Sequence, residues 1–187
     1  MAGQRARLAR ILYEKSYLEG DFTLTSGRKS DYYFDCRQSS LHPEGATLIA
    51  SLFLAMMRGM SIQAVAGMTM GADPLVSATS VTAFGRGIFL PALIVRKEAK
   101  GHGTARAIEG LVNVAAGDAV LVLEDVVSTG GSVLQACLKV KEAGLRVPAV
   151  FCILNREEGG TETLAEAGYP VHSIFTRSEL VALARTG

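Results

Sequence analysis

Residues 120–132, with the sequence VLVLEDVVSTGGS, place two acids and a glycine-rich polar turn directly after a run of apolar residues. The apolar run predicts a buried strand, and the helical pattern that follows places the turn where this strand passes into a helix. Glycine lets a ligand approach the backbone, and the free N–H groups of a helix N-terminus attract an anion. The segment therefore predicts a phosphate cradle made by Ser128, Thr129, Gly130, Gly131 and Ser132.

The acid pair Glu124 and Asp125 would stand at the carboxyl end of the same strand, where open α/β sheets bind their ligands. Two neighbouring carboxylates suit the paired hydroxyls of a ribose, so a sugar with a 5′-phosphate fits the pair and the cradle together. The turn has neither the GK[ST] ending of a nucleoside triphosphatase loop nor the GxGxxG of a dinucleotide site. Spacing alone leaves open an acidic strand end followed by an ordinary capped helix.

A second segment, residues 96–106 with the sequence RKEAKGHGTAR, concentrates positive charge around two glycines that would permit motion. Cations that a closing loop brings to an anionic leaving group stabilise charge that develops in the transition state, and the closed loop excludes water. Taken alone, such a charge run is more often a solvated loop. Its candidate residues are Arg96, Lys97, Lys100, His102 and Arg106.

The elements that would position these residues alternate from about residue 43 onward. Helical patterns are interleaved with short apolar runs, which is typical of an α/β fold with a parallel sheet and helices on both faces. Asp73 would cap one helix, with Pro74 at its first helical position, and Gly144 would end another. No repeat or linker divides the chain, so we expect one domain over residues 1–187. The expected strands lie near 64–66, 89–95, 119–123, 147–154 and 171–175.

Composition restricts the class of protein. Apolar residues make up 49% of the chain and charged residues 20%, which is enough to bury a full core. The formal net charge of +1 gives no general attraction to nucleic acid or to a membrane, and we expect neither as a partner. Every apolar run is interrupted before the roughly 18–20 residues that a membrane helix needs. Residues 1–16 place Leu8, Ile11 and Leu12 at helical spacing and predict an amphipathic surface helix, not a signal peptide.

The cysteines and histidines carry little chemistry in this pattern. Cys36, Cys137 and Cys152 are widely spaced, which argues against a disulfide framework or a zinc site and suits a reducing cytoplasm. We expect each to pack as a small apolar residue. His42 and His172 have no acidic or metal-type partner at a recognisable spacing, so we expect both to be structural or exposed.

Residues 120–132 resemble the phosphoribosyl pyrophosphate signature of the type I phosphoribosyltransferases, which names the sugar donor but not the acceptor base. The resemblance implies the parallel-sheet fold of that family, with a small N-terminal hood. It also implies that Asp125 is catalytic. The donor would contact the continuous stretch Glu124, Asp125, Val126, Val127, Ser128, Thr129, Gly130, Gly131 and Ser132.

The spelling RKEAKGHG closely resembles the catalytic loop of the orotate phosphoribosyltransferases, as opposed to that of the purine enzymes. This likeness implies a mobile catalytic loop at about residues 96–110, in which Lys97, Lys100 and His102 take part in catalysis. The same three residues and Arg96 would contact the donor. It further implies that Arg96 and Lys100 act in the active site of a neighbouring subunit, while Lys97 and His102 act in their own. A homodimer follows from that arrangement.

Two further stretches agree with this family. FTLTSGRKSDYYFD, read as two short strands around a turn at Ser26 and Gly27, is similar to the hood over the base, which we place mainly at residues 18–40; LNREEGG is similar to a later base-contacting loop. The likeness implies that Tyr33, Phe34, Ser128 and Arg156 contact orotate, with Arg156 on its carboxylate, and an arginine fork does match a carboxylate. Without the resemblance, Arg156 fits a surface ion pair and the two aromatic residues fit the core.

Residues 67–74, GMTMGADP, are similar to the loop that holds pyrophosphate, with Met70 and Gly71 as its contacts. Some relatives carry lysines where this chain has Gly71 and Thr25, so other groups must meet part of the pyrophosphate charge. We expect Mg²⁺ as the cofactor, because hard oxygen ligands and phosphates suit it. It would be bound through the substrates, with Asp125 as the one protein residue that could contact it.

The expected activity is the transfer of ribose 5-phosphate from phosphoribosyl pyrophosphate to orotate, which gives orotidine 5′-phosphate and pyrophosphate in pyrimidine nucleotide synthesis. The expected location is the cytoplasm. Two alternatives remain at this point. One is a phosphoribosyltransferase for a purine or for uracil, and the other is a regulatory protein of the same fold that senses the donor and binds nucleic acid.

Overall fold

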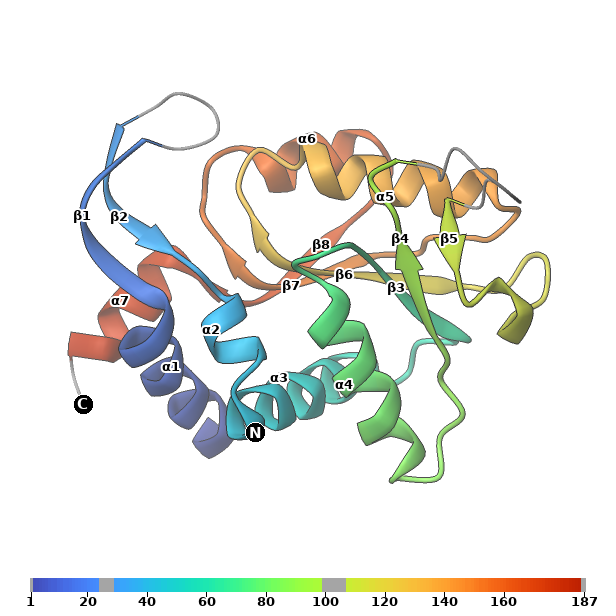
Figure 1. Cartoon of the computed structure of the whole chain (residues 1–187), viewed down its shortest axis with the longest axis horizontal. Helices are drawn as coiled ribbons and strands as arrows, with labels where there is room; N and C mark the ends of the chain where they lie inside the picture. The colour runs from blue at the N-terminus through green and yellow to red at the C-terminus, as the bar shows by residue number, and fades with distance from the viewer. Residues whose placement is uncertain (1, 24–28, 99–106, 186–187) are drawn as a thin grey trace.

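A six-stranded sheet forms the centre of the computed structural model, which describes residues 2–23, 29–98 and 107–185. The strands lie in the order β5-β4-β3-β6-β7-β8 (Figure 1), and neighbours run parallel except for β5, which is antiparallel to β4. Their bounds are β3 Ala64–Met68, β4 Ala92–Val95, β5 Ile108–Glu109, β6 Val120–Val127, β7 Val150–Asn155 and β8 Val171–Thr176.

Helices cover both faces of this sheet, which confirms the predicted α/β class. One face carries α1 (Ala2–Ser16), α2 (Arg37–Ser40), α3 (Pro43–Met56), α4 (Asp73–Phe84) and α7 (Arg177–Arg185). The other face carries α5 (Gly131–Glu142) and α6 (Gly160–Glu166), and a single 3-10 turn, η1 (Leu111–Asn113), precedes β6. The sheet is thus the middle one of three layers.

The central strand β6 shows why its sequence reads as an unbroken apolar run. Leu121 and Leu123 pack into the core on the α3 side, whereas Val120 and Val122 pack into the core on the α5 side. Successive side chains of a strand point to opposite faces, so a strand covered on both sides needs apolar residues at every position. These four side chains are fully buried, and they anchor the strand that leads to the acid pair.

A separate two-stranded antiparallel sheet, made by β1 (Tyr17–Thr23) and β2 (Lys29–Phe34), lies in the segment expected to form the hood. It rises beside the main sheet in Figure 1. Tyr17 pairs with Phe34 at its base, where the rings lie 5.1 Å apart and Phe34 is buried in the core. The turn expected at Ser26 and Gly27 lies outside the described residues.

Several predicted boundaries were wrong, for reasons of tertiary context. The third predicted strand runs on to Val127, because its acids continue a parallel ladder with β7, in which Glu124 pairs with Cys152 and Val127 with Asn155. The strand predicted at 89–95 begins only at Ala92, after the exposed Phe89. Strand β7 likewise begins after Pro148, and the two-residue strand β5 was not predicted.

Helix starts also differ from the prediction. Ala72, not Asp73, stands at the N-cap of α4, and Asp73 and Pro74 are its first two residues. The Asp73 carboxylate instead accepts a hydrogen bond of 2.9 Å from the hydroxyl of Thr69. His42 caps α3, where its Nδ1 accepts a hydrogen bond from the backbone N–H of Gly45, so its predicted structural role is confirmed.

The remaining small predictions hold. Helix α1 buries Leu8, Ile11 and Leu12 against the core, as their spacing predicted. Cys36, Cys137 and Cys152 are unpaired and buried in the two cores. His172 is exposed and lies edge-on to the ring of Phe151. None of the helices in the described ranges is long and apolar enough to span a membrane.

Candidate active site

The junction of β6 and α5 has the geometry expected of a phosphate cradle. Gly130 has a φ of 84°, a left-handed conformation that favours glycine, and its carbonyl accepts the first hydrogen bond of α5 from Leu134. A Cβ placed on Gly131 would meet no atom within 4 Å, so the backbone at the start of α5 is open to a ligand. Thr129 is exposed and Ser128 is half-buried beside it.

The cradle is joined to the loop that carries Arg156 through backbone contacts. The N–H of Arg156 donates to the carbonyl of Val127 at 2.9 Å, and the N–H of Gly160 donates to the carbonyl of Ser128 at 2.9 Å. A Cβ on Gly160 would collide with that Ser128 carbonyl and would lie 2.9 Å from the backbone nitrogen of Gly130. Only glycine fits this contact, so the cradle and the loop at 156–160 share one rigid junction.

The acid pair lies next to the cradle, within β6. Glu124 is 7% exposed, and its Oε1 accepts a hydrogen bond of 3.1 Å from the backbone N–H of Asp125. Asp125 is half-buried, and its Oδ1 accepts from the N–H of Val126 at 2.8 Å. Burial and the neighbouring Asp125 carboxylate hold the pKa of Glu124 well above its ordinary value, and Lys97 opposes this shift. Glu124 therefore keeps its proton to a higher pH than an ordinary glutamate does.

The raised pKa of Glu124 predicts a pH-dependent stability. As the pH rises above 4.5, the ordinary value, the unfolded chain loses this proton first, so the free energy of unfolding falls until the folded carboxyl also ionises. Glu124→Gln removes this dependence. We expect the melting temperature of the variant, relative to the unsubstituted chain, to increase from pH 4.5 towards mildly alkaline pH, as measured by thermal unfolding without ligands. A difference that stays constant with pH would contradict the burial argument.

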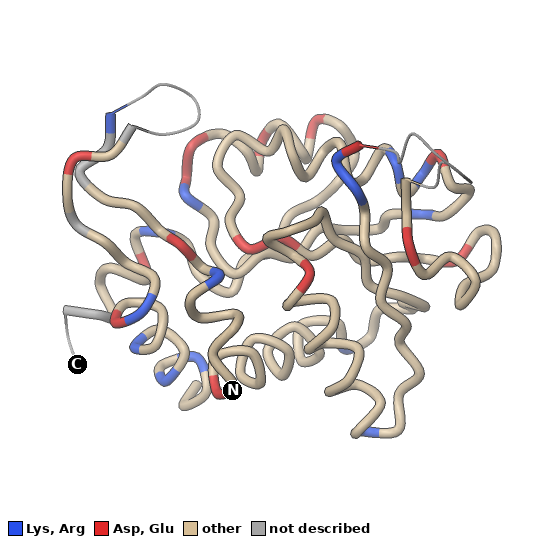
Figure 2. Tube along the Cα trace, in the orientation of Figure 1, with Lys and Arg blue, Asp and Glu red and all other residues tan. Residues whose placement is uncertain are grey.

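The predicted pyrophosphate loop, between β3 and α4, lies against the acid pair. A Cβ on Gly71 would sit 3.1 Å from Oδ2 of Asp125, so the absence of a side chain at Gly71 allows this close approach. Met70 is 71% exposed, and the Thr69–Met70 peptide bond is cis. Figure 2 shows the acidic positions of β6 and of the start of α4 side by side at the centre of the trace.

The described residues on either side of the cationic segment's central part, 96–98 and 107–109, lie at the edge of the main sheet. Arg96 donates its backbone N–H to Ala107, and its guanidinium forms an ion pair of 2.6 Å with Glu109 in β5. Lys97 is exposed, and its charge lowers the pKa of Glu124, against the larger effect of burial. Lys100, His102 and Arg106 lie outside the described residues.

Arg156 is not the exposed ion pair that its sequence neighbours allow. Its side chain is 7% exposed and lies 3.1 Å from the Glu158 carboxylate. One of its terminal nitrogens also donates to the hydroxyl of Tyr32 at 3.3 Å. Its Nε is buried and has no hydrogen-bond partner within the described part of the chain. A buried donor in this state favours a ligand that brings an acceptor.

The two aromatic residues predicted to contact orotate face opposite ways, because neighbours in a strand alternate. Phe34 is 5% exposed and packs beside Tyr17 and Tyr32, whereas Tyr33 is half-buried and lies 5.6 Å from the ring of Phe22. Tyr32, which was not among the predicted site residues, contacts the Arg156 side chain in the structure.

Sequence reasoning also missed Lys139, Gly160 and Glu158. Lys139 contacts the start of the cationic segment, Gly160 contacts the cradle and Glu158 pairs with Arg156. The alternation of side chains along β2 could have indicated Tyr32, because it places Tyr32 on the same face of the strand as Phe34. Nothing local identifies Lys139, since its partners lie more than 40 residues away along the chain. Among the described residues, no group of three or more His, Cys, Asp or Glu side chains could hold a metal ion by itself.

Fold and site together define a type I phosphoribosyltransferase. The structure superposes on the crystal structure of Mycobacterium tuberculosis H37Rv orotate phosphoribosyltransferase in complex with phosphoribosyl pyrophosphate, with a TM-score of 0.79 and 31% identity; the match covers 95% of this chain and 99% of that one. No family model matches the sequence.

Two curated relatives match over nearly their full lengths. The orotate phosphoribosyltransferase of Thermosynechococcus vestitus is 47% identical over 182 residues, which are 97% of this chain and 95% of that protein. That of Sorangium cellulosum is 44% identical over 181 residues, with 96% and 94% covered. The chain belongs to the orotate phosphoribosyltransferase family.

Proposed function

We propose that this chain transfers ribose 5-phosphate from phosphoribosyl pyrophosphate to orotate, giving orotidine 5′-phosphate and pyrophosphate in pyrimidine nucleotide synthesis. One observation carries the acceptor assignment: the Arg156 side chain is buried, its backbone N–H donates to the last residue of β6, and its Nε has no hydrogen-bond partner among the described residues. Orotate carries a carboxylate, and the neutral bases adenine, hypoxanthine and uracil do not. An arginine fork beside a phosphate cradle therefore favours orotate over those bases.

The donor would be held along β6 and the start of α5. The 5′-phosphate would accept hydrogen bonds from the open backbone and hydroxyls of residues 128–132, at the positive end of the helix. Asp125 and Glu124 would accept hydrogen bonds from the ribose hydroxyls. Residues 69–71 would present backbone groups to the pyrophosphate, and Lys97 would supply positive charge on its other side.

The chemical step needs no covalent bond to the enzyme. The bond between the anomeric carbon and pyrophosphate lengthens, positive charge develops on the ribose ring, and the ring nitrogen of orotate attacks from the opposite face. Arg156 and Ser128 would hold the base in line for that attack. Tyr33 and Phe34 were predicted for the same role, but they face opposite ways from β2, so only one of them could contact the base. We assign stabilisation of the leaving pyrophosphate and proton donation to Lys100 and His102, which lie outside the described residues.

We propose Mg²⁺ as the cofactor. The donor set fits it in part, since Asp125 presents a half-buried carboxylate next to Gly71, and oxygen ligands of this kind suit a hard cation. When bound with the donor, Mg²⁺ would neutralise charge on the leaving group. Asp125 would orient the ribose at the same time.

The test of the function is an absorbance assay. Orotate, the donor and Mg²⁺ are mixed with the chain, and loss of the orotate ultraviolet absorbance is the expected result. Adenine, hypoxanthine and uracil are assayed in parallel. Turnover of one of these in place of orotate would assign a different acceptor. Donor binding without any transfer, together with a gel shift of nucleic acid, would assign a regulatory protein.

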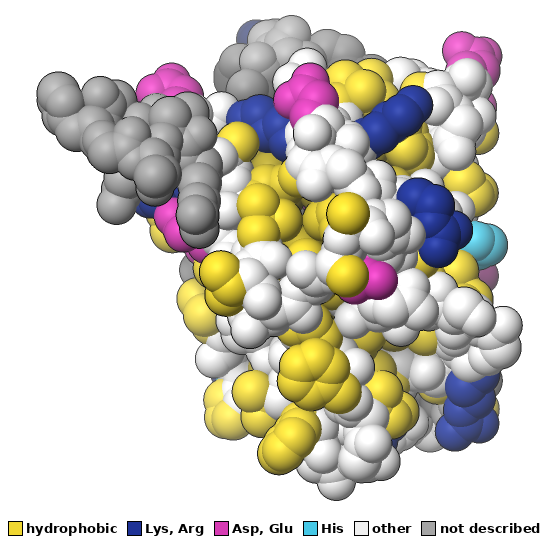
Figure 3. All heavy atoms as spheres, turned by 90° about the vertical axis from the view of Figure 1, so that its right-hand side faces the viewer, with side chains coloured by type: hydrophobic (Ala, Val, Ile, Leu, Met, Phe, Trp, Pro, Cys, Tyr) yellow, Lys and Arg dark blue, Asp and Glu magenta, His cyan; other side chains and the backbone are white. Residues whose placement is uncertain are grey.

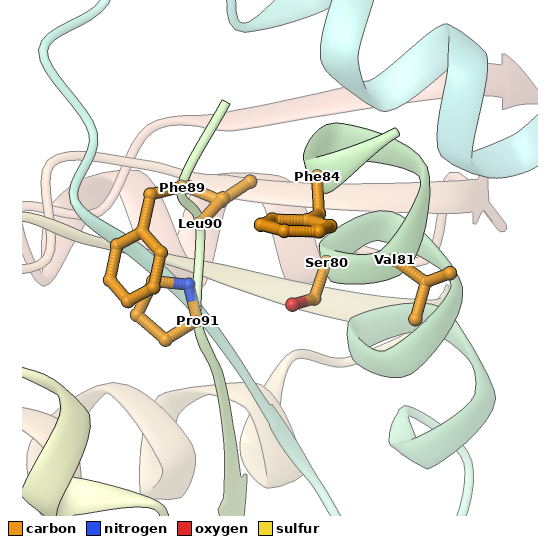
Figure 4. A pocket seen from close by; sticks show the side chains of 6 residues that line it. All are labelled: Ser80, Val81, Phe84, Phe89, Leu90 and Pro91. Carbon is orange, nitrogen blue, oxygen red and sulfur yellow. The ribbon is translucent and has the colours of Figure 1, made fainter. Parts of the chain in front are cut away.

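We further propose that the chain works as a homodimer in the cytoplasm, and an exposed apolar patch supports the dimer. Figure 3 shows hydrophobic side chains gathered low on the face that forms the right-hand side of Figure 1. A shallow pocket of about 270 Å³ lies there (Figure 4), between α4 and the chain that leads into β4. Val81, Phe84 and Phe89 are each 74% exposed. Such a cluster of large apolar side chains is typical of a protein interface.

The patch lies where the chain enters β4, and the cationic segment begins where the chain leaves this strand. Phe89 precedes β4 and Arg96 follows it, so the strand of Ala92–Val95 connects the apolar patch to the first residue of the cationic segment. A second copy seated on the patch would cover the chain that leads into β4, the strand whose other end carries the segment proposed to act between subunits. The three buried, unpaired cysteines suit a reducing compartment.

Charge on the patch should separate the subunits. The double substitution of Phe84 and Phe89 by glutamate buries two unpaired carboxylates in the proposed interface, which costs several kcal/mol per subunit. We expect sedimentation equilibrium to give a dimer for the unsubstituted chain and a monomer of low activity for the variant. Val112→Glu, at a residue 83% exposed in η1, is the control and should remain dimeric. A monomeric unsubstituted chain with full activity would contradict the proposal.

A further inference from the structure

Lys139 joins the phosphate-cradle helix to the start of the cationic segment. It lies on α5 and is half-buried. Its ammonium donates to the backbone carbonyl of Arg96 and to that of Lys97, at 2.7 Å in each case. Both acceptors lie just beyond Val95, where β4 ends, so the sheet ladder of β4 does not hold them. One side chain thus fixes two successive peptide groups as the chain leaves the sheet.

The geometry of α5 makes this contact informative. The helix begins at Gly131, in the cradle, and reaches Lys139 eight residues later, a rise of about 12 Å. Its apolar face, with Val133, Ala136 and Val140, is packed into the core, so the helix is a rigid spacer. The distance between the cradle and the carbonyls of Arg96 and Lys97 is therefore set by α5 and by the Lys139 side chain.

We infer that Lys139 is a positioning residue for phosphoribosyl transfer, an inference that rests on the proposed function. Among the described residues, the Lys139 ammonium donates only to backbone oxygens, so Lys139 is not a catalytic residue. It holds the peptide groups from which the Arg96 and Lys97 side chains project, and it sets their place relative to the cradle. Its contribution belongs to the binding of the pyrophosphate-bearing donor, because α5 carries both the start of the cradle and Lys139, while Arg156 on the acceptor side is held by β6 and β2.

A merely structural lysine would behave differently. Loss of a structural contact lowers the melting temperature and alters both substrates' kinetic constants together. Loss of a positioning contact changes the donor constants and leaves those of orotate in place. The experiment therefore separates the Michaelis constants of the two substrates.

The decisive variants are Lys139→Met, which removes the charge and the donors, and Lys139→Arg, which keeps both. We expect the methionine variant to raise the Michaelis constant for the donor about 10-fold, the scale for losing hydrogen bonds from one charged group. The constant for orotate should stay within about twofold, and arginine should restore most of the loss. Lys139→Gln, with a neutral donor, should be intermediate and covers the case in which methionine impairs folding. Lys141→Met, at an exposed lysine on the same helix, is the matched control and should have no effect.

Two results would overturn the inference while leaving the proposed function standing. One is a Lys139→Met variant whose Michaelis constant for the donor is unchanged, while the unsubstituted chain is active. The other is an equal rise in both Michaelis constants that arginine does not correct, with a lower melting temperature. An unsubstituted chain that is folded but transfers nothing to orotate would instead overturn the proposed function, and this inference with it.

Discussion

Arg156→Leu should raise the Michaelis constant for orotate about 10²–10³-fold, the scale for removing one partner of a buried, hydrogen-bonded charge pair. The Arg156 side chain is 7% exposed, its Nε has no partner in the described part of the chain, and its position is fixed by the Val127 carbonyl. The orotate carboxylate would lose a bidentate donor in a dry site. The dissociation constant of the phosphoribosyl donor, measured by calorimetry, should remain within a few-fold, because the cradle lies on β6 and α5.

Controls must separate orotate recognition from the stability of the fold, because Arg156→Leu also leaves charged groups near the guanidinium without their partner. Glu158 is the nearest of them, with a side chain 14% exposed. Arg156→Lys keeps a positive charge for Glu158 but not the planar fork, so it should fold normally and still lose orotate affinity. Arg58→Leu, an exposed arginine after α3, should change nothing. An Arg156→Lys enzyme with an unaltered orotate constant would remove the carboxylate contact from the mechanism.

Asp125→Asn should weaken donor binding in the presence of Mg²⁺ by about 10–100-fold, because an ionised acceptor of hydroxyl hydrogen bonds and a metal-type oxygen become a neutral amide. The pKa of Glu124 should fall at the same time, since the Asp125 carboxylate is one cause of its elevation. A more readily ionised Glu124 then recovers part of the lost interaction. The size of the loss therefore shrinks as the pH increases.

Isothermal titration of the donor at several pH values would measure this. Asp118→Asn is a matched control, because Asp118 precedes the opposite end of the same strand and binds the backbone N–H of Ala115. It should leave the donor affinity unchanged. Equal dissociation constants for the unsubstituted chain and the Asp125 variant would refute the assigned ribose contact.

The sequence predicted the elements whose cause is local. Alternation of apolar runs with helical patterns located β3, β6, β7 and β8, and the αL glycine and open start of α5 follow from STGGS. The true length of β6 could not be predicted, because the pairing of Glu124, Val126 and Val127 with β7 overrides the low strand preference of the two acids. Strand β5 could not be predicted either, because its two residues form a strand only through their pairing with β4.

The candidate site divides in the same way. The cradle and the acid pair are contiguous in sequence, so their types and spacing were enough to predict a sugar phosphate. Contacts between distant segments were not predictable, such as Tyr32 with Arg156 and Lys139 with the carbonyls after β4. Burial of Arg156 is also a tertiary property, since two glutamates beside it in the sequence are equally typical of a solvated loop.

The contact between Gly160 and Ser128 has a consequence for redesigning which base this scaffold accepts. The loop at 156–160 cannot be exchanged as an independent module, because its last residue packs directly against the backbone of Ser128 and Gly130, in the proposed phosphate cradle. A transplanted loop that brings any larger residue to position 160 would push Ser128 and Gly130 outwards and disable the sugar-binding half as well. New acceptor specificity on this chain must be built by side-chain exchange around an untouched glycine.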